Sequence, residues 1–370
     1  MILLNDFQRQ WADTRVDAMA AFEAVGASGW YILGKQVESF ERALAAYWKM
    51  PNAVGVASGL DAIEIALRAL GCRAGDRVLT TPLSAFATTL AIVKLGAIPV
   101  FVDCEVHGLI DLEACRRVFE SRRDIRFFVP VHLYGHALDS AALGELRERF
   151  ELRIVEDCAQ SIGASRGGVP TGLAGHAAAT SFYPTKNLGA LGDGGALLTA
   201  DPAVAAAARC LRDYGQNAKY KHDEIGYNSR LDELQAALLD RVYLPRLESW
   251  TARRREIAAA YLAGIQNPGV RPMGAPAGSD SCWHLFPVIV AADRKQAFMA
   301  HLRASGVACA EHYPILIPDQ AALANSPHEL ASDCARARAI AHGEVSLPIH
   351  PYLTGEECAT VIGACNRWAG

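Results

Sequence analysis

The stretch from residue 152 to 187, LRIVEDCAQSIGASRGGVPTGLAGHAAATSFYPTKN, decides the fold. It contains two apolar strand candidates, LRIVED (152–157) and AATSFY (178–183), and polar residues follow each of them. Neither candidate alternates cleanly between apolar and polar residues, which indicates that both faces of the strand are buried. Strands of this kind predict a mostly parallel sheet with helices on both sides.

The same rhythm of short strands and helix-length segments runs from residue 53 to 200 and is typical of βαβ units. Further strands are expected at AVGVAS (53–58), RVLTTP (77–82), IPVFVD (98–103), FFVPVHL (127–133) and GALLTA (195–200). Helices are expected between them, at 60–70, 85–95, 111–121 and 139–149. The fold class is therefore α/β, with a three-layer α/β/α large domain.

After residue 200 the pattern changes to long helical stretches and then to a second, smaller unit. In the stretch 231–265, Pro245 cannot continue the helical hydrogen bonds and should kink or restart the helix. Arg253 to Arg255 are expected to form an exposed basic run. A strand, HLFPVIV (284–290), predicts a small α+β domain, so we expect a large domain over 1–245 and a small one over 246–370.

Composition excludes several classes of protein. The 370 residues are 51% hydrophobic and 21% charged, as in ordinary folded proteins, and the net charge of -4 gives no field that attracts nucleic acid or anionic membrane. The ten cysteines form no C-x-x-C motif, which favours reduced thiols in a cytosolic protein. The N-terminus does not read as a secretory signal, and no apolar run approaches the ~18 residues of a membrane span. We therefore expect a cytoplasmic protein with no membrane or nucleic-acid partner.

Chemistry-bearing residues gather just after the predicted strands, where open α/β sheets bind their ligands. Ser58-Gly59-Leu60-Asp61 opens a helix, and the backbone N–H groups there suit a phosphate. Asp157 and Gln160 follow one strand, and Lys186 follows the next. A carboxylate and a lysine at one sheet edge are what a pyridoxal phosphate (PLP) enzyme needs, although a structural ion pair explains the pattern equally well. His132 and His136 follow a strand rather than lying on one helical face, so no metal site is expected.

Five segments together resemble one family of sugar aminotransferases, often called DegT/DnrJ/EryC1/StrS. They are GWYILGKQVESFE (29–41), VEDCAQSIGA (155–164), SFYPTKNLGALGDGGA (181–196), YGQNAKY (214–220) and GYNSRLDELQAAL (226–238). HLFPV, HYPI and VSLPIHP continue the resemblance in the C-terminal part. The resemblance covers nearly the whole chain and implies a fold-type-I PLP aminotransferase, a homodimer with two active sites at the subunit interface.

The resemblance also implies roles for single residues. Lys186 would form a Schiff base with PLP and carry protons, and Asp157 would pair with the pyridinium nitrogen. Further cofactor contacts are implied for Gln160 at the phenolic oxygen, Phe86 on the ring, and Ser181, Gly59, Leu60 and Asn228 of the partner subunit at the phosphate. Leu60 stands where the family more often has threonine, so one hydroxyl contact to the phosphate is lost.

The substrate implied is a nucleotide-linked ketosugar, with glutamate as amino donor. Tyr183 and the run Asn187-Leu188-Gly189 resemble members that aminate C-3, which favours a dTDP-3-keto-6-deoxyhexose. The resemblance places Lys219 near the diphosphate, although an exposed loop lysine is an equal alternative. His312 and Tyr313 resemble residues that border the sugar pocket, and the alternative is that this pair packs against the sheet.

Alternatives stay open within the class and beyond it. They are a UDP-linked 3-keto-hexuronic acid, a C-4 ketosugar, and a PLP-binding regulatory protein. Sugar dehydration is disfavoured because the related dehydratases have histidine where this chain has Lys186.

Overall fold

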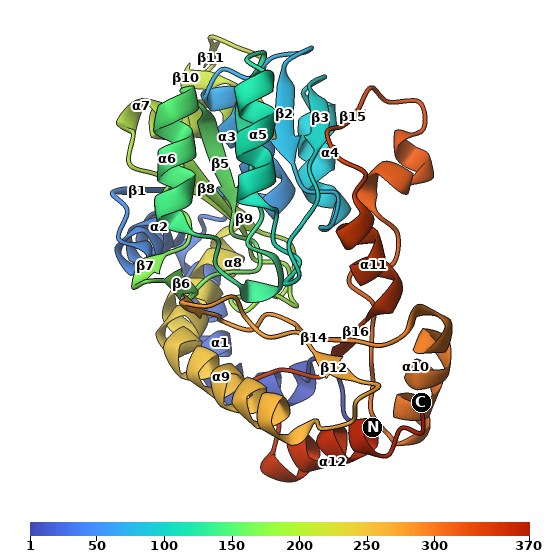
Figure 1. Ribbon diagram of the computed structural model, residues 1–370. Helices are drawn as coiled ribbons and strands as arrows, with labels where there is room; N and C mark the ends of the chain where they lie inside the picture. The colour runs from blue at the N-terminus through green and yellow to red at the C-terminus, as the bar shows by residue number, and fades with distance from the viewer.

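An eight-stranded sheet forms the centre of the larger part of the molecule (Figure 1). The computed structural model describes residues 1–370. The strand order is β1-β9-β8-β5-β4-β2-β3-β15, and only β9 runs antiparallel to its neighbours. The strands are β1 (Asn52–Val56), β2 (Arg77–Thr80), β3 (Ile98–Phe101), β4 (Ile125–Val129), β5 (Arg153–Asp157), β8 (Ala177–Ser181), β9 (Gly195–Thr199) and β15 (Glu329–Leu330). All seven strands predicted for this sheet are confirmed, whereas β15 was not predicted.

Helices cover both faces of the sheet because neighbouring residues of each strand point to opposite sides. Val78 and Phe127 pack on one face, while Leu79 and Phe128, the next residues along, pack on the other. The first face is covered by α3 (Gly59–Ala69), α4 (Phe86–Lys94) and α7 (Pro202–Arg212). The second is covered by α5 (Leu112–Ser121), α6 (Ser140–Phe150), α11 (Ala335–Gly343) and, over its β1 side, α1 (Phe7–Ser28), α2 (Lys35–Trp48) and α8 (Glu233–Leu238). The three-layer prediction is confirmed.

The helical bridge after α8 is broken as its proline predicts. A π-helical turn, η2 (Leu239–Tyr243), and a 3-10 turn, η3 (Leu244–Arg246), separate α8 from the long helix α9 (Leu247–Gly264). The expectation of an exposed basic run is wrong for Arg254, which is buried and donates to the carbonyl oxygen of Ile349 at 2.6 Å. A guanidinium that reaches backbone carbonyls is hydrogen-bonded inside the protein, so its position in a basic run says little about exposure.

A smaller sheet of β12 (Arg271–Pro272), β14 (Phe286–Ile289) and β16 (Glu344–Leu347) lies in the C-terminal part. It packs with α9, α10 (Lys295–Ala304) and α12 (Gly355–Asn366) around one apolar cluster. The N-terminal segment joins this part, because Ile2 pairs with Val307, and both chain termini lie near each other in Figure 1. Strand β15 and helix α11 return to the large sheet, and the boundary at residue 245 stays a prediction.

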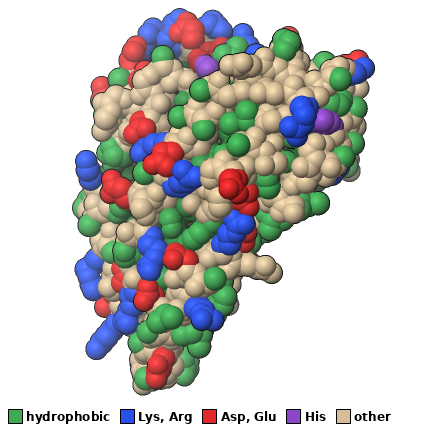
Figure 2. Space-filling view, turned by 90° about the horizontal axis from the view of Figure 1, so that it is seen from below, with side chains coloured by type: hydrophobic (Ala, Val, Ile, Leu, Met, Phe, Trp, Pro, Cys, Tyr) green, Lys and Arg blue, Asp and Glu red, His purple; other side chains and the backbone are tan.

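The surface carries charges of both signs. Figure 2 shows lysine and arginine side chains interspersed with aspartate and glutamate on the face that it presents. None of the helices is both long and apolar enough to cross a membrane.

Candidate active site

A cavity of about 460 Å³ opens at the carboxyl ends of β1, β5 and β8, between the large sheet and the C-terminal part. Nine of the twelve residues predicted for the site line it. They are Gly59, Leu60, Asp157, Gln160, Ser181, Tyr183, Lys186, His312 and Tyr313. The parallel sheet brings them together because the strands of a parallel sheet end at the same edge.

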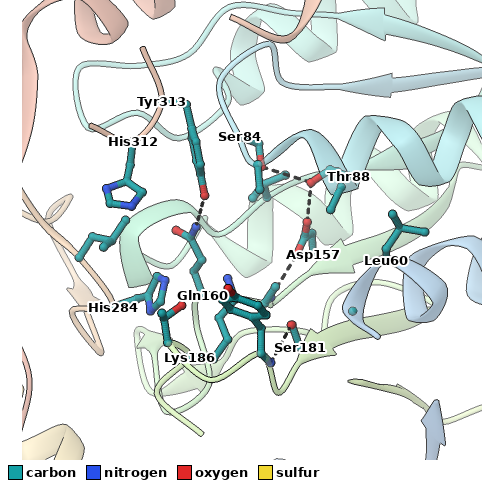
Figure 3. Close-up of a pocket in the computed structure, with 18 of the residues that line it drawn as sticks. Leu60, Ser84, Thr88, Asp157, Gln160, Ser181, Lys186, His284, His312 and Tyr313 are labelled. Atoms are coloured by element: carbon teal, nitrogen blue, oxygen red, sulfur yellow. Dashed lines mark hydrogen bonds between the residues drawn. The ribbon is translucent and has the colours of Figure 1, made fainter. Parts of the chain in front are cut away.

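Asp157 is the last residue of β5 and is held from two sides. Its Oδ2 accepts a hydrogen bond from the Thr88 hydroxyl at 2.8 Å, and its Oδ1 accepts from the backbone N–H of Ala159 at 3.0 Å (Figure 3). Ser84 is hydrogen-bonded to Thr88 at 3.2 Å. Since both oxygens are oriented by these bonds, the carboxylate presents a fixed edge to the cavity.

Lys186 lies in the loop after β8, and its side chain reaches the same cavity (Figure 3). The protein packed around its amine lowers the pKa to about 8, while the negative charge of Asp157 acts in the opposite direction. An amine with this pKa is far more often neutral near pH 7 than an ordinary lysine, whose pKa is about 10.4. Lys186 is therefore a competent nucleophile and proton carrier.

The turn from β1 into α3 forms a close-packed cradle. Ser58 caps α3 by accepting from the backbone N–H of Asp61, and the first N–H groups of a helix have no partner within it. A Cβ on Gly59 would lie 2.5 Å from the Cβ of Ser181, so only glycine lets the turn approach β8. The helix N-terminus, Ser58 and Ser181 together suit a phosphate.

The opposite wall is built from Gln160 and the C-terminal part. Gln160 accepts from the backbone N–H of Tyr134 at 2.7 Å and donates to the Tyr313 hydroxyl at 3.1 Å. Burial raises the pKa of Tyr313, so this hydroxyl stays protonated at neutral pH. His284 also lines the cavity, and burial together with the positive charge of Lys186 lowers its pKa.

Three predicted residues do not line the cavity of this chain. Phe86, the first residue of α4, packs against Phe101, Ile317 and Leu323, and its neighbours Ala85 and Ala87 line the cavity. Asn228 is exposed and accepts from Arg230 at 2.6 Å. Lys219 is exposed too, with its amine 5.3 Å from the centre of the Tyr220 ring.

Three of the four ring nitrogens in the histidines of the HLYGH segment are hydrogen-bonded within the protein, and Nε2 of His136 has no partner. His132 is hydrogen-bonded through Nε2 to Glu156 at 2.8 Å, and its Nδ1 accepts from the backbone N–H of Leu138. His136 is bonded to Ser281 at 3.0 Å. No cluster of three metal-ligating side chains occurs in the chain.

Several lining residues were missed from the sequence. Thr88, which orients Asp157, stands two residues after the predicted ring contact Phe86, and His284 stands in the HLFPV segment of the family resemblance. The other missed polar residues include Asn5, Ser84, Thr185 and Asp193, and nothing in the sequence around Asn5 indicates a site.

Pyridoxal phosphate fits these residues. The cradle at Gly59 and Ser181 suits its phosphate, the fixed carboxylate of Asp157 suits its ring nitrogen, and Lys186 offers an amine of lowered pKa to its aldehyde. This chain therefore offers a partner for the phosphate, the ring nitrogen and the aldehyde of the cofactor.

Comparisons with known proteins agree with this reading. The model of the DegT/DnrJ/EryC1/StrS aminotransferase family matches residues 12–366. The chain is 42% identical over 98% of its length to the dTDP-3-amino-3,4,6-trideoxy-alpha-D-glucose transaminase of Streptomyces venezuelae, 95% of which is covered.

Solved structures agree as well. The X-ray structure of S. venezuelae DesV in complex with a ketimine intermediate is 41% identical, with a TM-score of 0.94 over 100% of this chain and 98% of the other. The structure of NtdA from Bacillus subtilis with bound cofactor PMP is 28% identical, with a TM-score of 0.86 over 95% of this chain and 81% of the other. The predicted family, fold type and cofactor are thereby confirmed. The chain belongs to the DegT/DnrJ/EryC1/StrS aminotransferase family and is a PLP-dependent aminotransferase of fold type I.

Proposed function

We propose that this aminotransferase moves the amino group of glutamate to the C-3 keto carbon of a dTDP-3-keto-6-deoxyhexose, giving a 3-amino-3,6-dideoxyhexose. The observation that carries the proposal is the 42% identity, over nearly the whole chain, to a relative named as a dTDP-3-amino-trideoxyglucose transaminase. The complete set of cavity residues around Lys186 and Asp157 supports turnover rather than regulation alone.

The cofactor, when bound, supplies an electron sink for the bonds at the amino-bearing carbon. In this proposal the Lys186 amine would hold the cofactor and would carry the proton between the reacting carbons. Asp157 keeps the ring nitrogen protonated, Gln160 meets the phenolic oxygen, and the Gly59-Leu60 amides with Ser181 hold the phosphate. Burial of Lys186 and the hydrogen bonds on Asp157 support these roles.

A neutral sugar fits the cavity better than a hexuronic acid. Among the residues of this chain that line the cavity, Lys186 is the only lysine or arginine. A hexuronate carries a C-5 carboxylate that calls for a cation of its own, because a buried carboxylate without a partner is costly. This supports the deoxyhexose over the UDP-linked 3-keto-hexuronic acid. Tyr183, His312 and Tyr313 are then the residues that border the sugar.

The active unit in this proposal is a cytoplasmic homodimer with shared sites. Asn228 of the partner subunit would complete the phosphate site, and Lys219 would meet the diphosphate. Exposed apolar side chains at Trp30 and Tyr31, 63% and 56% exposed, support a covered interface. Ten free cysteines support a reducing compartment.

Transfer of label tests the function. The enzyme is incubated with 15N-glutamate and either a dTDP-3-keto-6-deoxyhexose or a UDP-N-acetyl-3-keto-hexuronic acid, and the products are analysed by mass spectrometry and NMR. The proposal expects 15N on C-3 of the dTDP-sugar. Labelling of the hexuronate alone would contradict the sugar, and tight PLP binding with no transfer to either would favour a regulatory role.

A further inference from the structure

A buried carboxyl group lies behind the sugar side of the cavity and takes no part in the roles given so far. Glu344, the first residue of β16, is 0% exposed. Its Oε2 accepts from the backbone N–H of His312 at 2.6 Å, and its Oε1 is hydrogen-bonded to the Ser346 hydroxyl at 2.5 Å. The same hydroxyl is hydrogen-bonded to Nδ1 of His312 at 2.9 Å. Glu344, Ser346 and His312 thus form a continuous line, called here the carboxyl relay.

The relay ends in the cavity. His312 lines it, and Figure 3 shows the His312 ring beside Tyr313 on the same wall as His284. Nδ1 of His312 is committed to Ser346, and Nε2 has no hydrogen-bond partner within the chain. Nε2 is therefore the atom of the relay that meets a ligand.

Counting protons shows that the two ends of the relay are coupled. The Ser346 hydroxyl has one proton to donate. If Glu344 is ionised, Ser346 donates to it, His312 donates from Nδ1, and Nε2 carries a lone pair. If Glu344 is protonated, it donates to Ser346, Ser346 donates to Nδ1, and Nε2 carries the proton.

The surroundings make both states accessible. Burial raises the pKa of Glu344 to about 8, against the opposing effects of Ser346, the His312 N–H and the Lys295 ammonium. Burial, with the positive charge of Lys186, lowers the pKa of His312 to about 4, so the ring is neutral at physiological pH. Lys295 itself is paired with Glu311 at 2.6 Å. The other titratable groups near the relay are Cys309, Tyr134 and Tyr313 around Glu344, and His284 beside His312.

We propose that Glu344 and Ser346 are positioning residues that set the tautomer of His312 toward the sugar. While Glu344 holds its proton, Nε2 donates a hydrogen bond to an oxygen of the ketosugar, and once Glu344 is ionised Nε2 turns into an acceptor. This inference rests on the proposed function for its ligand, but the tautomer itself is measurable without any sugar.

The first experiment reads the tautomer directly. The PLP-loaded enzyme is labelled with 15N-histidine, the His312 signals are assigned with a His312→Gln variant, and spectra are recorded from about pH 6 to about pH 10. Wild type should change from the Nε2–H to the Nδ1–H form near pH 8. Glu344→Gln, which donates like protonated Glu344 but cannot ionise, should keep Nε2–H throughout.

Serine variants separate the relay from general packing. Ser346→Thr keeps a hydroxyl and should keep the transition, whereas Ser346→Ala should abolish it. Ser281→Ala is the matched control, because it also removes a buried serine bonded to a histidine, His136, but neither residue lines the cavity. A transition that survives in Glu344→Gln or Ser346→Ala, or a wild-type tautomer that ignores pH, would overturn the proposal.

The second experiment measures the consequence for the sugar. Ser346→Ala should raise KM for the ketosugar about three- to tenfold, the worth of one hydrogen bond, with kcat and the glutamate half-reaction nearly unchanged. In wild type, KM for the ketosugar should rise above pH 8, where Glu344 ionises. Glu344→Gln should have the wild-type KM at neutral pH but should not show this rise. If the His312 tautomer depends on Glu344 but no ketosugar reacts, the proposed function is contradicted and this inference is not. If the ketosugar reacts but its KM does not change in the Glu344 and Ser346 variants, this inference is contradicted and the proposed function is not.

Discussion

The proposed chemistry depends above all on one group, the Lys186 amine. Its surroundings lower its pKa to about 8, and the charge of Asp157 limits that shift. Lowering comes from desolvation, which disfavours the charged ammonium. The balance leaves an amine that exchanges its proton near physiological pH, as a proton carrier must.

The pH dependence of cofactor attachment tests this balance. The neutral amine is the nucleophile, so the rate at which apoenzyme binds PLP covalently should rise with pH, level off above about 8, and fall about tenfold per unit below it. Asp157→Asn removes the opposing charge and should move the midpoint to lower pH. Lys186→Ala should lose the covalent link altogether. A midpoint near 10 in wild type would contradict a desolvated Lys186.

Most of the site residues could be predicted from the sequence, because the ends of the strands can be recognised in it. Asp157, Gln160, Ser181 and Lys186 each follow a strand, and all of them line the cavity. The direction of a side chain at a helix start cannot be predicted in the same way, and Phe86 packs beside the cavity rather than lining it. The partners of His312 were missed because Glu344 and Ser346 are distant in sequence and look like ordinary strand residues.

At the scale of secondary-structure elements, the carboxylate of Glu233 links helices α2 and α8. Glu233, at the start of α8, accepts from the backbone N–H groups of Gly34, Gln36 and Val37 at 2.9 Å each. These are donors at the N-terminus of α2, which have no partner within the helix. Glu233 is only 2% exposed, so no water replaces it. It therefore acts as an N-cap supplied from far along the chain.

Removing this cap should destabilise the fold. Glu233→Ala leaves three donors without this partner, one of them on buried Val37, and is expected to lower the free energy of unfolding by about 2–4 kcal/mol, measured by denaturant titration. Glu233→Gln retains one acceptor and should lose less. Glu38→Ala, an exposed glutamate in the first turn of α2, is the control and should cost about 0.5 kcal/mol or less. Equal losses in Glu233→Ala and Glu38→Ala would refute the cap.

Elements with strong periodicity were predicted and short ones were not. The strands and helices from 53 to 200 carry long apolar runs that fix their type. Strand β15 has only two residues and forms by pairing with the edge strand β3, so no local sequence pattern predicts it. The restart at Pro245 was predictable because proline lacks the N–H that a helix needs.

At the scale of the whole molecule, the site is expected to need two chains. Asn228 is exposed on its own chain and does not reach its own cavity. A site shared in trans accounts for both facts, because a symmetric dimer brings the same surface of each copy to the other.

Mixing two inactive variants tests the shared site. Lys186→Ala and Asn228→Ala subunits are refolded or exchanged together, and heterodimers then hold one site with both residues intact. Random pairing makes half the dimers mixed, so activity should return to about a quarter of wild type. The control is Asn217→Ala, which changes another exposed asparagine. This variant should be active without being mixed with Lys186→Ala. A fully active monomer would contradict the arrangement.

The regiochemistry of amino transfer tests the central claim most directly. The enzyme is first converted to its pyridoxamine phosphate form with glutamate, freed of donor, and mixed in single turnover with dTDP-3-keto- and dTDP-4-keto-6-deoxyhexose in parallel. The cavity must hold one keto carbon at the Lys186 amine, and misplacement by one ring position removes the advantage of proximity. The account predicts that the 3-keto sugar reacts at least about tenfold faster, and faster reaction of the 4-keto sugar would contradict it.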